Sequence, residues 1–522
     1  MNNLPHKPYG IPEPAYSGPK RSLILAGGGM RVAYQAGVIR ALIESGLCFT
    51  HADGTSGGTI NLAMLLSGLS PIQMCDRWRT LNVKDFVSFV PPEQYLKAWN
   101  LLAMGDADGI IDHVFPHLGI DVEKINAAVG IQGTFNVCNF NHKTNEVIPH
   151  DRIDLDLLVA GISLPIFMPP VKKGNYLYTD SVWIKDANLM EAVRRGAEEL
   201  WVVWCIGNSS EYQTGIFHQY VQMIELSANG ALFEECDRIN EINQRILQGE
   251  TVYGHTKPIK LHLIKPAYPL PLDPDYYLGN IDGATLIDMG YADAKQYLQT
   301  MSLEGLPFQP DITQMQDNLP GMTFIERMAG GFVLDETDPI KGAAQGKADN
   351  SLLSIQLTIN IHDLKRFLSD ANFTASVTGC ISFPAFGENI PIKSSVFNLF
   401  ASTNNSQYKY IVYELAFEHA SQDYYLVGNK ELHDDLGFDM WKDITTVYIC
   451  LYQGTDRQSP IIGSGILTLD VGDIGKLVSG LQITNVKSLT EKATLLAEFG
   501  RFFWGNIWET YQSSLRSDNF RF

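Results

Sequence analysis

Two glycine-rich segments near the start of the chain contain the residues best suited to chemistry. The first reads Gly-Gly-Gly-Met-Arg at residues 27–31, and the second reads Gly-Thr-Ser-Gly-Gly at residues 54–58. A serine inside a Gly-x-Ser-x-Gly turn can present its hydroxyl as a nucleophile on a sharp strand-to-helix bend. Backbone N–H groups of a glycine loop can stabilise the oxyanion that forms when a hydroxyl attacks an ester. Together the segments indicate a serine acyl hydrolase with Ser56 as its nucleophile.

The N–H groups of Gly28, Gly29 and Gly57 are the candidate donors to that oxyanion. A dinucleotide-binding loop is the alternative for the first segment, but it requires Gly-x-Gly-x-x-Gly, and Val32 stands where the third glycine would be. No Gly-Lys-Ser or Gly-Lys-Thr follows, so the sequence of a nucleoside-triphosphate loop is also missing. The oxyanion interpretation is therefore favoured.

The segments around the two turns predict the elements that position them. Residues 22–26 and 49–52 are short apolar runs, which are typical of buried parallel strands. After each turn, residues 32–43 and 59–69 carry apolar side chains at helical spacing. Strand, glycine loop, helix, strand, serine turn and helix thus follow in order. This order favours a parallel sheet with both turns at its carboxyl edge.

Ser56 needs a base that takes its proton. A histidine would be the usual base, but none of the 12 histidines stands in a context that resembles the histidine of a catalytic triad. Among the carboxylates, Asp180 follows the proline-rich apolar segment 160–171 and the short aromatic run 176–178. A carboxylate is therefore a better candidate for the base than a histidine.

At this point the chain resembles the patatin-like phospholipase family over about residues 21–300. Five blocks carry the resemblance in order, and they are residues 27–31, residues 54–58, the block with Pro165, Phe167 and Pro169, Asp180, and residues 288–294. The resemblance implies a three-layer α/β/α domain with a mainly parallel sheet. It also implies that Ser56 and Asp180 form a dyad without histidine. The glycine loop would be the oxyanion hole, supported by Gly27 and by Arg31, for which a loop salt bridge is the alternative.

Two positions depart from the family pattern. Val32 stands where the family usually has glycine, and a β-branched residue avoids positive φ. Ser181 stands where a glycine usually follows the catalytic aspartate. A literal Asp-Gly pair occurs at Asp282, but it lacks the preceding proline block. Asp180 is therefore the expected base, and Asp282 is the alternative.

The resemblance implies hydrolysis of ester bonds in phospholipids or other lipids. Two alternatives stay open, namely a catalytically silent patatin-like scaffold that binds lipid or protein, and an esterase for small soluble esters. The first alternative is motivated by Val32 and Ser181. No cluster of His, Cys and carboxylate residues has metal-ligand spacing, so we expect no metal, and no cofactor is implied.

The composition restricts partners and location. The 522 residues include 39 Lys and Arg against 58 Asp and Glu, which gives a net charge of −19. This charge argues against nucleic-acid binding and against electrostatic docking on anionic membranes, but it leaves hydrophobic, peripheral membrane contact open. Seven widely spaced cysteines without a Cys-x-x-Cys pair predict reduced thiols. Without a signal peptide or transmembrane run, we expect a cytoplasmic protein of undetermined oligomeric state.

Changes in composition and in the pattern of apolar residues along the chain predict four segments. The polar, glycine-containing stretch 335–350 is typical of a linker. Beyond it, apolar and polar residues alternate as in strands, for example at residues 354–361. This part loosely resembles a module joined to cholesterol-oxidase-like proteins and lipases, from which no function is carried over. The expected segments are an extended arm at 1–20, an acyl hydrolase domain at 21–305, a connecting segment and linker at 306–350, and a β-rich domain at 351–522.

Overall fold

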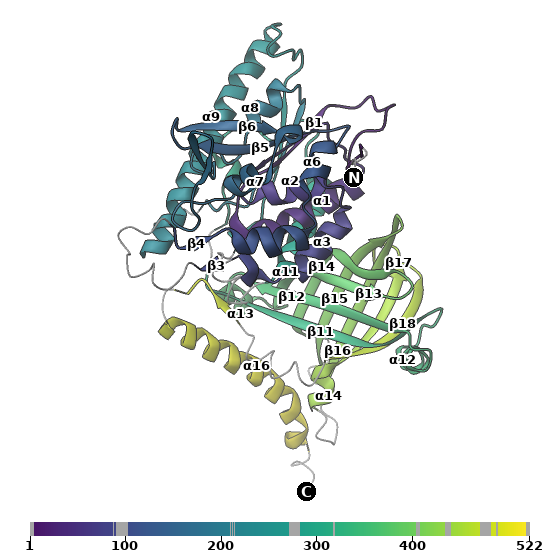
Figure 1. Cartoon of the computed structure of the whole chain (residues 1–522). Helices are drawn as coiled ribbons and strands as arrows, with labels where there is room; N and C mark the ends of the chain where they lie inside the picture. The colour runs from purple at the N-terminus through teal and green to yellow at the C-terminus, as the bar shows by residue number, and fades with distance from the viewer. Residues whose placement is uncertain are drawn as a thin grey trace. The chain divides into compact units, whose positions relative to one another are not determined.

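The chain, drawn as a ribbon in Figure 1, folds into two compact units, Met1–Asp317 and Asn318–Phe522. Each unit has its own hydrophobic core. The computed structural model describes residues 5–86, 88–89, 103–208, 210, 212, 214–270, 282–316, 319–402, 408–433, 440–469, 482–486 and 489–517. The two units are described in turn.

An eight-stranded sheet forms the centre of the first unit, in the order β10-β9-β1-β2-β5-β8-β7 with β6 paired to β5. Strands β10, β9, β1, β2 and β5 are parallel, and β6, β7 and β8 are antiparallel. Their bounds are β1 Arg21–Leu25, β2 His51–Thr55, β5 Gln132–Asn139, β6 Thr144–Pro149, β7 Val171–Lys173, β8 Tyr176–Thr179, β9 Glu199–Val203 and β10 Lys260–Ile264. A separate pair joins β3 Ser88–Phe89 to β4 Gly105–Asp106.

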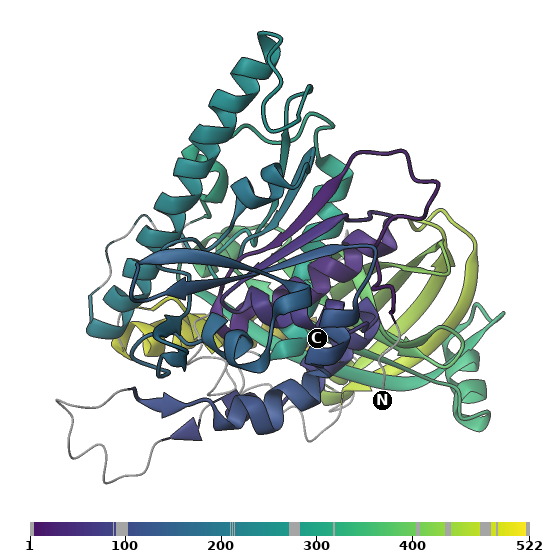
Figure 2. The ribbon, with the colours of Figure 1, turned by 45° about the horizontal axis from the view of Figure 1, so that its top comes forward.

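Helices cover both faces of this sheet. Along β1, Leu23 and Leu25 belong to one core cluster while Ile24 and Ala26 belong to another, because successive strand residues point to opposite faces. The first cluster includes residues of four helices, α1 (Ala33–Glu44), α2 (Gly58–Leu66), α3 (Pro71–Thr80) and α11 (Gly283–Thr300). The second includes residues of α8 (Leu189–Arg194) and α9 (Ile216–Leu247). The prediction of a three-layer α/β/α domain with a mainly parallel sheet is confirmed. The long teal helix in Figure 2 is α9.

The helices of the first unit have the following bounds: α1 Ala33–Glu44, α2 Gly58–Leu66, α3 Pro71–Thr80, α5 Phe115–Leu118, α6 Val122–Ala127, α7 Leu155–Gly161, α8 Leu189–Arg194, α9 Ile216–Leu247 and α11 Gly283–Thr300. Short 3-10 segments occur at Gly29–Val32, Val83–Phe86, His150–Arg152 and Pro310–Thr313, and a π-helical turn occurs at Ile110–Val114. Residues 288–294, the last of the five blocks that carry the family resemblance, lie inside α11.

The second unit is an antiparallel sheet that closes on itself. Strands β12 to β18 follow one another in order, and β11 pairs with both β12 and β18, while β19 pairs with β11. The strands are β11 Gly321–Leu334, β12 Leu352–Ile361, β13 Thr374–Phe383, β14 Gly387–Ser402, β15 Tyr408–His419, β16 Gln422–His433, β17 Thr446–Gln453, β18 Ile461–Leu469 and β19 Gln482–Thr484. The helices are α12 Pro339–Ala348, α13 Leu364–Ser369, α14 Met440–Thr445 and α16 Leu489–Ser517. The prediction of a β-rich C-terminal domain is confirmed.

Residues 306–350 were expected to be a connecting segment and linker, but from residue 318 onward they belong to the second unit. This segment contains β11, which closes the sheet, and α12. Its glycines serve close packing of α12, because a Cβ at Gly342 would stand 2.3 Å from the Ser464 carbonyl oxygen and one at Gly346 would stand 2.2 Å from the Phe332 nitrogen. The glycines that made this segment resemble a linker are therefore required where α12 packs closely on the sheet. The two units divide near residue 317.

We expect a fragment of residues 318–522 to unfold cooperatively and a fragment of residues 351–522 to aggregate or to lack a cooperative transition. The shorter fragment lacks β11, so β12 and β18 would keep unpaired edges. It would also bury the Lys430 ammonium without Glu326, whose Oε1 lies 3.3 Å away in the full chain. Thermal unfolding followed by circular dichroism checks this, and equal transitions of the two fragments would contradict it.

Candidate active site

Ser56 lies on a sharp turn between β2 and α2. Its φ is 52°, which is uncommon for a residue other than glycine and is characteristic of a nucleophile elbow. The turn lies against the end of β1, since a Cβ on Gly58 would stand only 2.1 Å from the Leu25 carbonyl oxygen. The predicted strand–serine–helix arrangement is therefore present, with glycine required where the chain passes so close.

The glycine loop after β1 lies beside this turn. A Cβ on Gly57 would stand 2.6 Å from the Gly29 carbonyl oxygen, and one on Gly27 would stand 2.9 Å from Ser56 Cβ. Gly28 and Gly29 both have positive φ, at 155° and 59°. Gly29 begins a 3-10 turn and Gly57 caps α2, and the first N–H groups of a helix have no partner within it. The three predicted donors are therefore close to Ser56.

Neither departure from the family pattern distorts the backbone. Val32 has φ −66°, an ordinary helical value at the start of α1, so its branched side chain meets no strain. Ser181 is buried without positive φ, and its hydroxyl donates to Asn145 Oδ1 at 2.5 Å. The alternative base Asp282 is the N-cap of α11, where its Oδ1 accepts from the Thr285 N–H at 2.8 Å. That role explains its Asp-Gly pair without catalysis.

Asp180 follows β8 and is buried together with Ser56. Its Oδ1 accepts from the Val182 N–H at 2.8 Å, while Oδ2 is buried and has no hydrogen-bond partner among the described residues. Burial raises the pKa of Asp180 to about 7, and the Ser56 hydroxyl and the N–H groups of Val182 and Ser181 oppose that rise. The Ser56 hydroxyl is thus close enough to the Asp180 carboxyl to affect its pKa. Hydrogen bonds of this kind often tighten only when substrate binds.

A second buried carboxyl, Asp186, was not identified from the sequence. Its two oxygens accept from the Gly27 N–H at 3.0 and 3.1 Å, so this glycine supports the loop and is not a free oxyanion donor. Burial is the main cause that raises the pKa of Asp186 to about 8, and the charge of Asp180 adds to the rise. The Gly27 N–H and the charge of Arg31 oppose it. No motif marks Asp186, and its only signal was its position six residues after Asp180.

Arg31 also holds the glycine loop. Its Nε donates to the Gly28 carbonyl oxygen at 2.9 Å, and the side chain is buried. Its positive charge also opposes the rise in the pKa of Asp186. The arginine thus stabilises the conformation of the loop through the Gly28 carbonyl group.

A buried hydrogen-bond network joins the strand of Ser56 to the segment of Asp180. Asn136 Nδ2 donates to Asp53 Oδ1 at 2.7 Å. Asn136 Oδ1 accepts from Asn145 Nδ2 at 2.8 Å and from Asn188 Nδ2 at 2.9 Å. Asn145 in turn accepts from Ser181. Because satisfied buried networks are rigid, this one holds the two halves of the site in register.

Residues 23–193 match the model of the family described as patatin-like phospholipase. This chain contains a patatin-like phospholipase domain. The match spans β1 to α8 and includes Ser56, Asp180 and Asp186. Members of this family are typically serine lipid hydrolases, so the match of residues 23–193 suggests lipid acyl hydrolase activity for this domain.

Other comparisons add little to the patatin-like domain. No curated protein sequence matched the chain. Among solved structures, the type III effector protein ExoU aligns with 12% sequence identity and a TM-score of 0.21, covering 56% of this chain and 76% of that chain.

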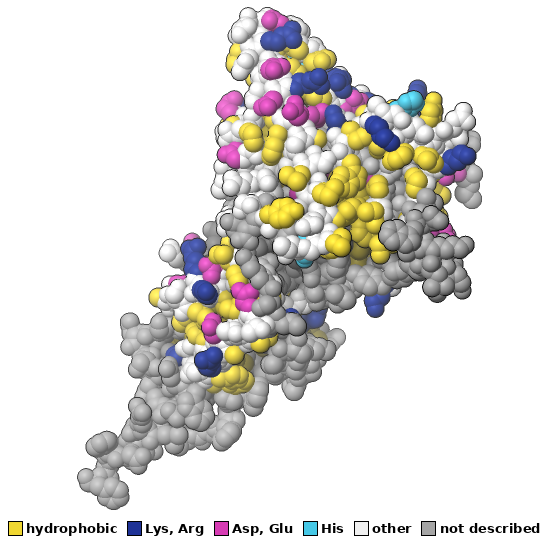
Figure 3. Space-filling view, turned by 90° about the vertical axis from the view of Figure 1, so that its left-hand side faces the viewer, with side chains coloured by type: hydrophobic (Ala, Val, Ile, Leu, Met, Phe, Trp, Pro, Cys, Tyr) yellow, Lys and Arg dark blue, Asp and Glu magenta, His cyan; other side chains and the backbone are white. Residues whose placement is uncertain are grey.

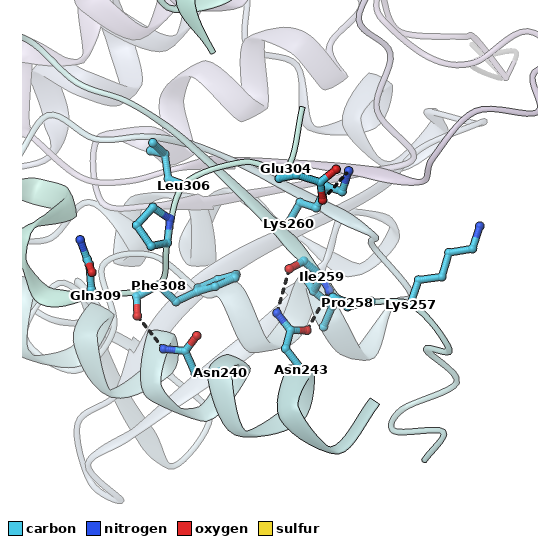
Figure 4. A pocket seen from close by; sticks show the side chains of 11 residues that line it. Asn240, Asn243, Lys257, Pro258, Ile259, Lys260, Glu304, Leu306, Phe308 and Gln309 are labelled. Atoms are coloured by element: carbon cyan, nitrogen blue, oxygen red, sulfur yellow. Dashed lines mark hydrogen bonds and ion pairs between the residues drawn. The ribbon is translucent and has the colours of Figure 1, made fainter. Parts of the chain in front are cut away.

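A cavity of about 600 Å³ lies between α9, the start of β10 and residues 304–309 (Figure 4). It includes neither Ser56 nor Asp180. Two of its polar side chains bind backbone, since Asn240 donates to the Phe308 carbonyl oxygen and Asn243 to that of Ile259. These contacts fasten α9 to its neighbours, so the cavity is not the candidate active site.

No group of three or more His, Cys, Asp and Glu side chains in the described part of the chain is arranged to hold a metal ion. No described helix is both long enough and apolar enough to cross a membrane.

We expect kcat/KM of the patatin-like domain on a soluble ester to rise with pH through about 7. Asp180 accepts a proton only when ionised, and burial places its pKa at about 7, so activity falls about tenfold per pH unit below that value. Asp186→Asn should leave this acid limb in place, because the Asp186 carboxyl is still protonated at that pH. A pH–rate profile checks both statements, and a limb at about 4, the ordinary value for aspartate, would contradict them.

Proposed function

We propose that the patatin-like domain is a serine acyl hydrolase that cleaves ester bonds of phospholipids or other lipids. The observation that carries the proposal is the strained Ser56 turn beside the buried carboxyl of Asp180, whose Oδ2 has no partner among the described residues. The match of residues 23–193 to the patatin-like phospholipase family supports a lipid ester as the substrate.

In the proposed reaction, Ser56 Oγ attacks the ester carbonyl carbon while its proton passes to Asp180 Oδ2. The N–H groups of Gly28, Gly29 and Gly57 stabilise the oxyanion of the tetrahedral intermediate. Collapse of that intermediate breaks the ester bond, and the leaving alcohol takes the proton from Asp180. Water then attacks the acyl-serine with Asp180 as base, which releases the fatty acid and restores Ser56.

The silent-scaffold alternative loses the observation that motivated it. Val32 has an ordinary helical φ, and Ser181 fits its buried position through a hydrogen bond to Asn145. The loop and the base segment therefore retain a geometry compatible with chemistry. We infer an active enzyme.

A fluorophosphonate probe tests the proposal directly. We expect stoichiometric labelling of the full-length chain, with the modified residue identified as Ser56 by mass spectrometry. A substrate panel then compares phosphatidylcholine vesicles with a short-chain nitrophenyl ester. Absence of labelling would favour the silent scaffold, and hydrolysis of the soluble ester alone would favour the small-ester alternative.

We further propose that the enzyme works in the cytoplasm. All seven cysteines are free, as expected for a protein kept in a reducing compartment. Fractionation of cells that express the chain would test this, and recovery only from an oxidising compartment would overturn it.

A further inference from the structure

The first half of α9 exposes apolar side chains along one face. Ile216 is 90% exposed and Leu226 is 74% exposed, and Met223 lies between them on the same face and is also exposed. Helical residues seven and ten positions apart share a face, which in an ordinary surface helix would be packed against the core. These side chains therefore form an exposed apolar stripe.

The two halves of α9 differ sharply in charge. Residues 216–233 contain a single Asp, Glu, Lys or Arg residue, Glu225, whereas residues 234–247 contain six. Figure 3 shows the same separation on the first unit, with hydrophobic side chains gathered on one part of its face and charged side chains on another. The apolar stripe is thus not simply part of a solvated helix.

The stripe adjoins the candidate active site. Tyr220, on the same half of α9, donates its hydroxyl to the Pro165 carbonyl oxygen at 2.7 Å. Its ring packs edge-on against Phe167 and Trp183, with centroids 5.5 and 5.7 Å away. Burial and the charge of Asp180 together raise the pKa of Tyr220 to about 12, which places this tyrosine near the dyad.

A strained residue adds to the apolar surface at the same place. Ile166, between Pro165 and Phe167, has φ 79° and is 54% exposed. Positive φ is unfavourable for a β-branched residue and is retained where the surrounding structure enforces it. Here the Ile166 carbonyl oxygen accepts from the N–H of Met104, another exposed apolar residue, at 2.8 Å. The fold therefore directs an isoleucine outward beside Tyr220.

From these contacts, and resting on the proposed function, we infer a docking surface for a zwitterionic or uncharged lipid layer. The docking surface consists of Met104, Ile166, Ile216, Met223 and Leu226. Its side chains enter the lipid layer and bring the entrance of the Ser56–Asp180 site to the ester.

Charge decides which lipid surface fits. Residues 163–168 and 214–233 contain no Lys or Arg, so the docking surface offers no cation to anionic headgroups. The net charge of −19 opposes them as well. Binding is therefore driven by apolar burial, which salt does not screen.

The test measures partition of the full-length chain onto phosphatidylcholine vesicles by sedimentation. The test variant is Ile216→Gln with Leu226→Gln, and the control is Leu247→Gln. Leu247 is 75% exposed at the charged end of the same helix, which matches Leu226 in residue type and exposure. We expect the double variant to lose about tenfold in partition per side chain and the control to lose none. Turnover of a soluble ester should be unchanged in both.

Equal partition of the double variant and the control would overturn the docking surface. So would binding that requires anionic lipid and collapses in moderate salt. If the unmodified chain failed to bind vesicles but formed a dimer, and if the double variant were monomeric, the apolar stripe would instead be a contact with a second copy of the chain. Because sedimentation does not depend on turnover, vesicle binding without ester hydrolysis would uphold docking and refute the proposed function, and the reverse result would do the opposite.

Discussion

Ser56→Ala is expected to abolish fluorophosphonate labelling and to lower kcat on a soluble ester by about a million-fold, the loss typical of removing a serine nucleophile. Alanine cannot form the acyl bond, and the oxyanion donors alone leave only residual catalysis. The fold should be retained, because the hydroxyl of Ser56 is not part of the buried network beneath the site. Steady-state kinetics and thermal unfolding measure the two effects.

Ser181→Ala is the matched control for this substitution. Ser181 is also a buried serine, one residue from Asp180, but its hydroxyl donates to Asn145. The control should keep its labelling, with at most a modest loss of turnover from the weakened network. Near-normal hydrolysis by Ser56→Ala would show that the reacting residue lies elsewhere.

Asp180→Asn is expected to lower kcat by about 1,000-fold, because Ser56 then has no group to receive its proton. Asn preserves the size of the side chain and an acceptor for the Val182 N–H, so the loss should reflect chemistry and not folding. Asp282→Asn is the control, since asparagine caps a helix about as well as aspartate does. It should be nearly silent.

Two results would contradict the assignment of Asp180. If Asp282→Asn were inactive and Asp180→Asn active, the base would have been placed on the wrong segment. If replacing one of the native histidines lowered kcat as much as Asp180→Asn does, a catalytic triad that includes histidine would be the better interpretation. His51, which lies on the strand of the nucleophile, is a poor candidate because its ring nitrogens face Ser22 Oγ at 2.7 Å and Thr134 Oγ1 at 2.9 Å. Burial also lowers the pKa of His51 to about 3.

The sequence was sufficient for features that depend on neighbouring residues. The glycine loop, the Ser56 turn and the alternation of strands with helices follow from local backbone preferences and from the period of apolar residues. The same local signals predicted a linker at residues 335–350, where the structure has α12. Glycine permits a flexible linker, but it also permits the tight packing of α12 against the sheet. Composition alone does not distinguish these two uses.

Tertiary structure decided what lies between distant segments. Asp186 meets Gly27 across 159 residues of sequence, and Tyr220 meets Pro165 across 55. The closing of the second sheet by β11 also depends on pairing with two strands at once. Such contacts arise when separate elements bury their apolar faces together, and a polar group carried into that interior must find a partner there. The identity of that partner depends on how the whole chain packs, which no local pattern contains.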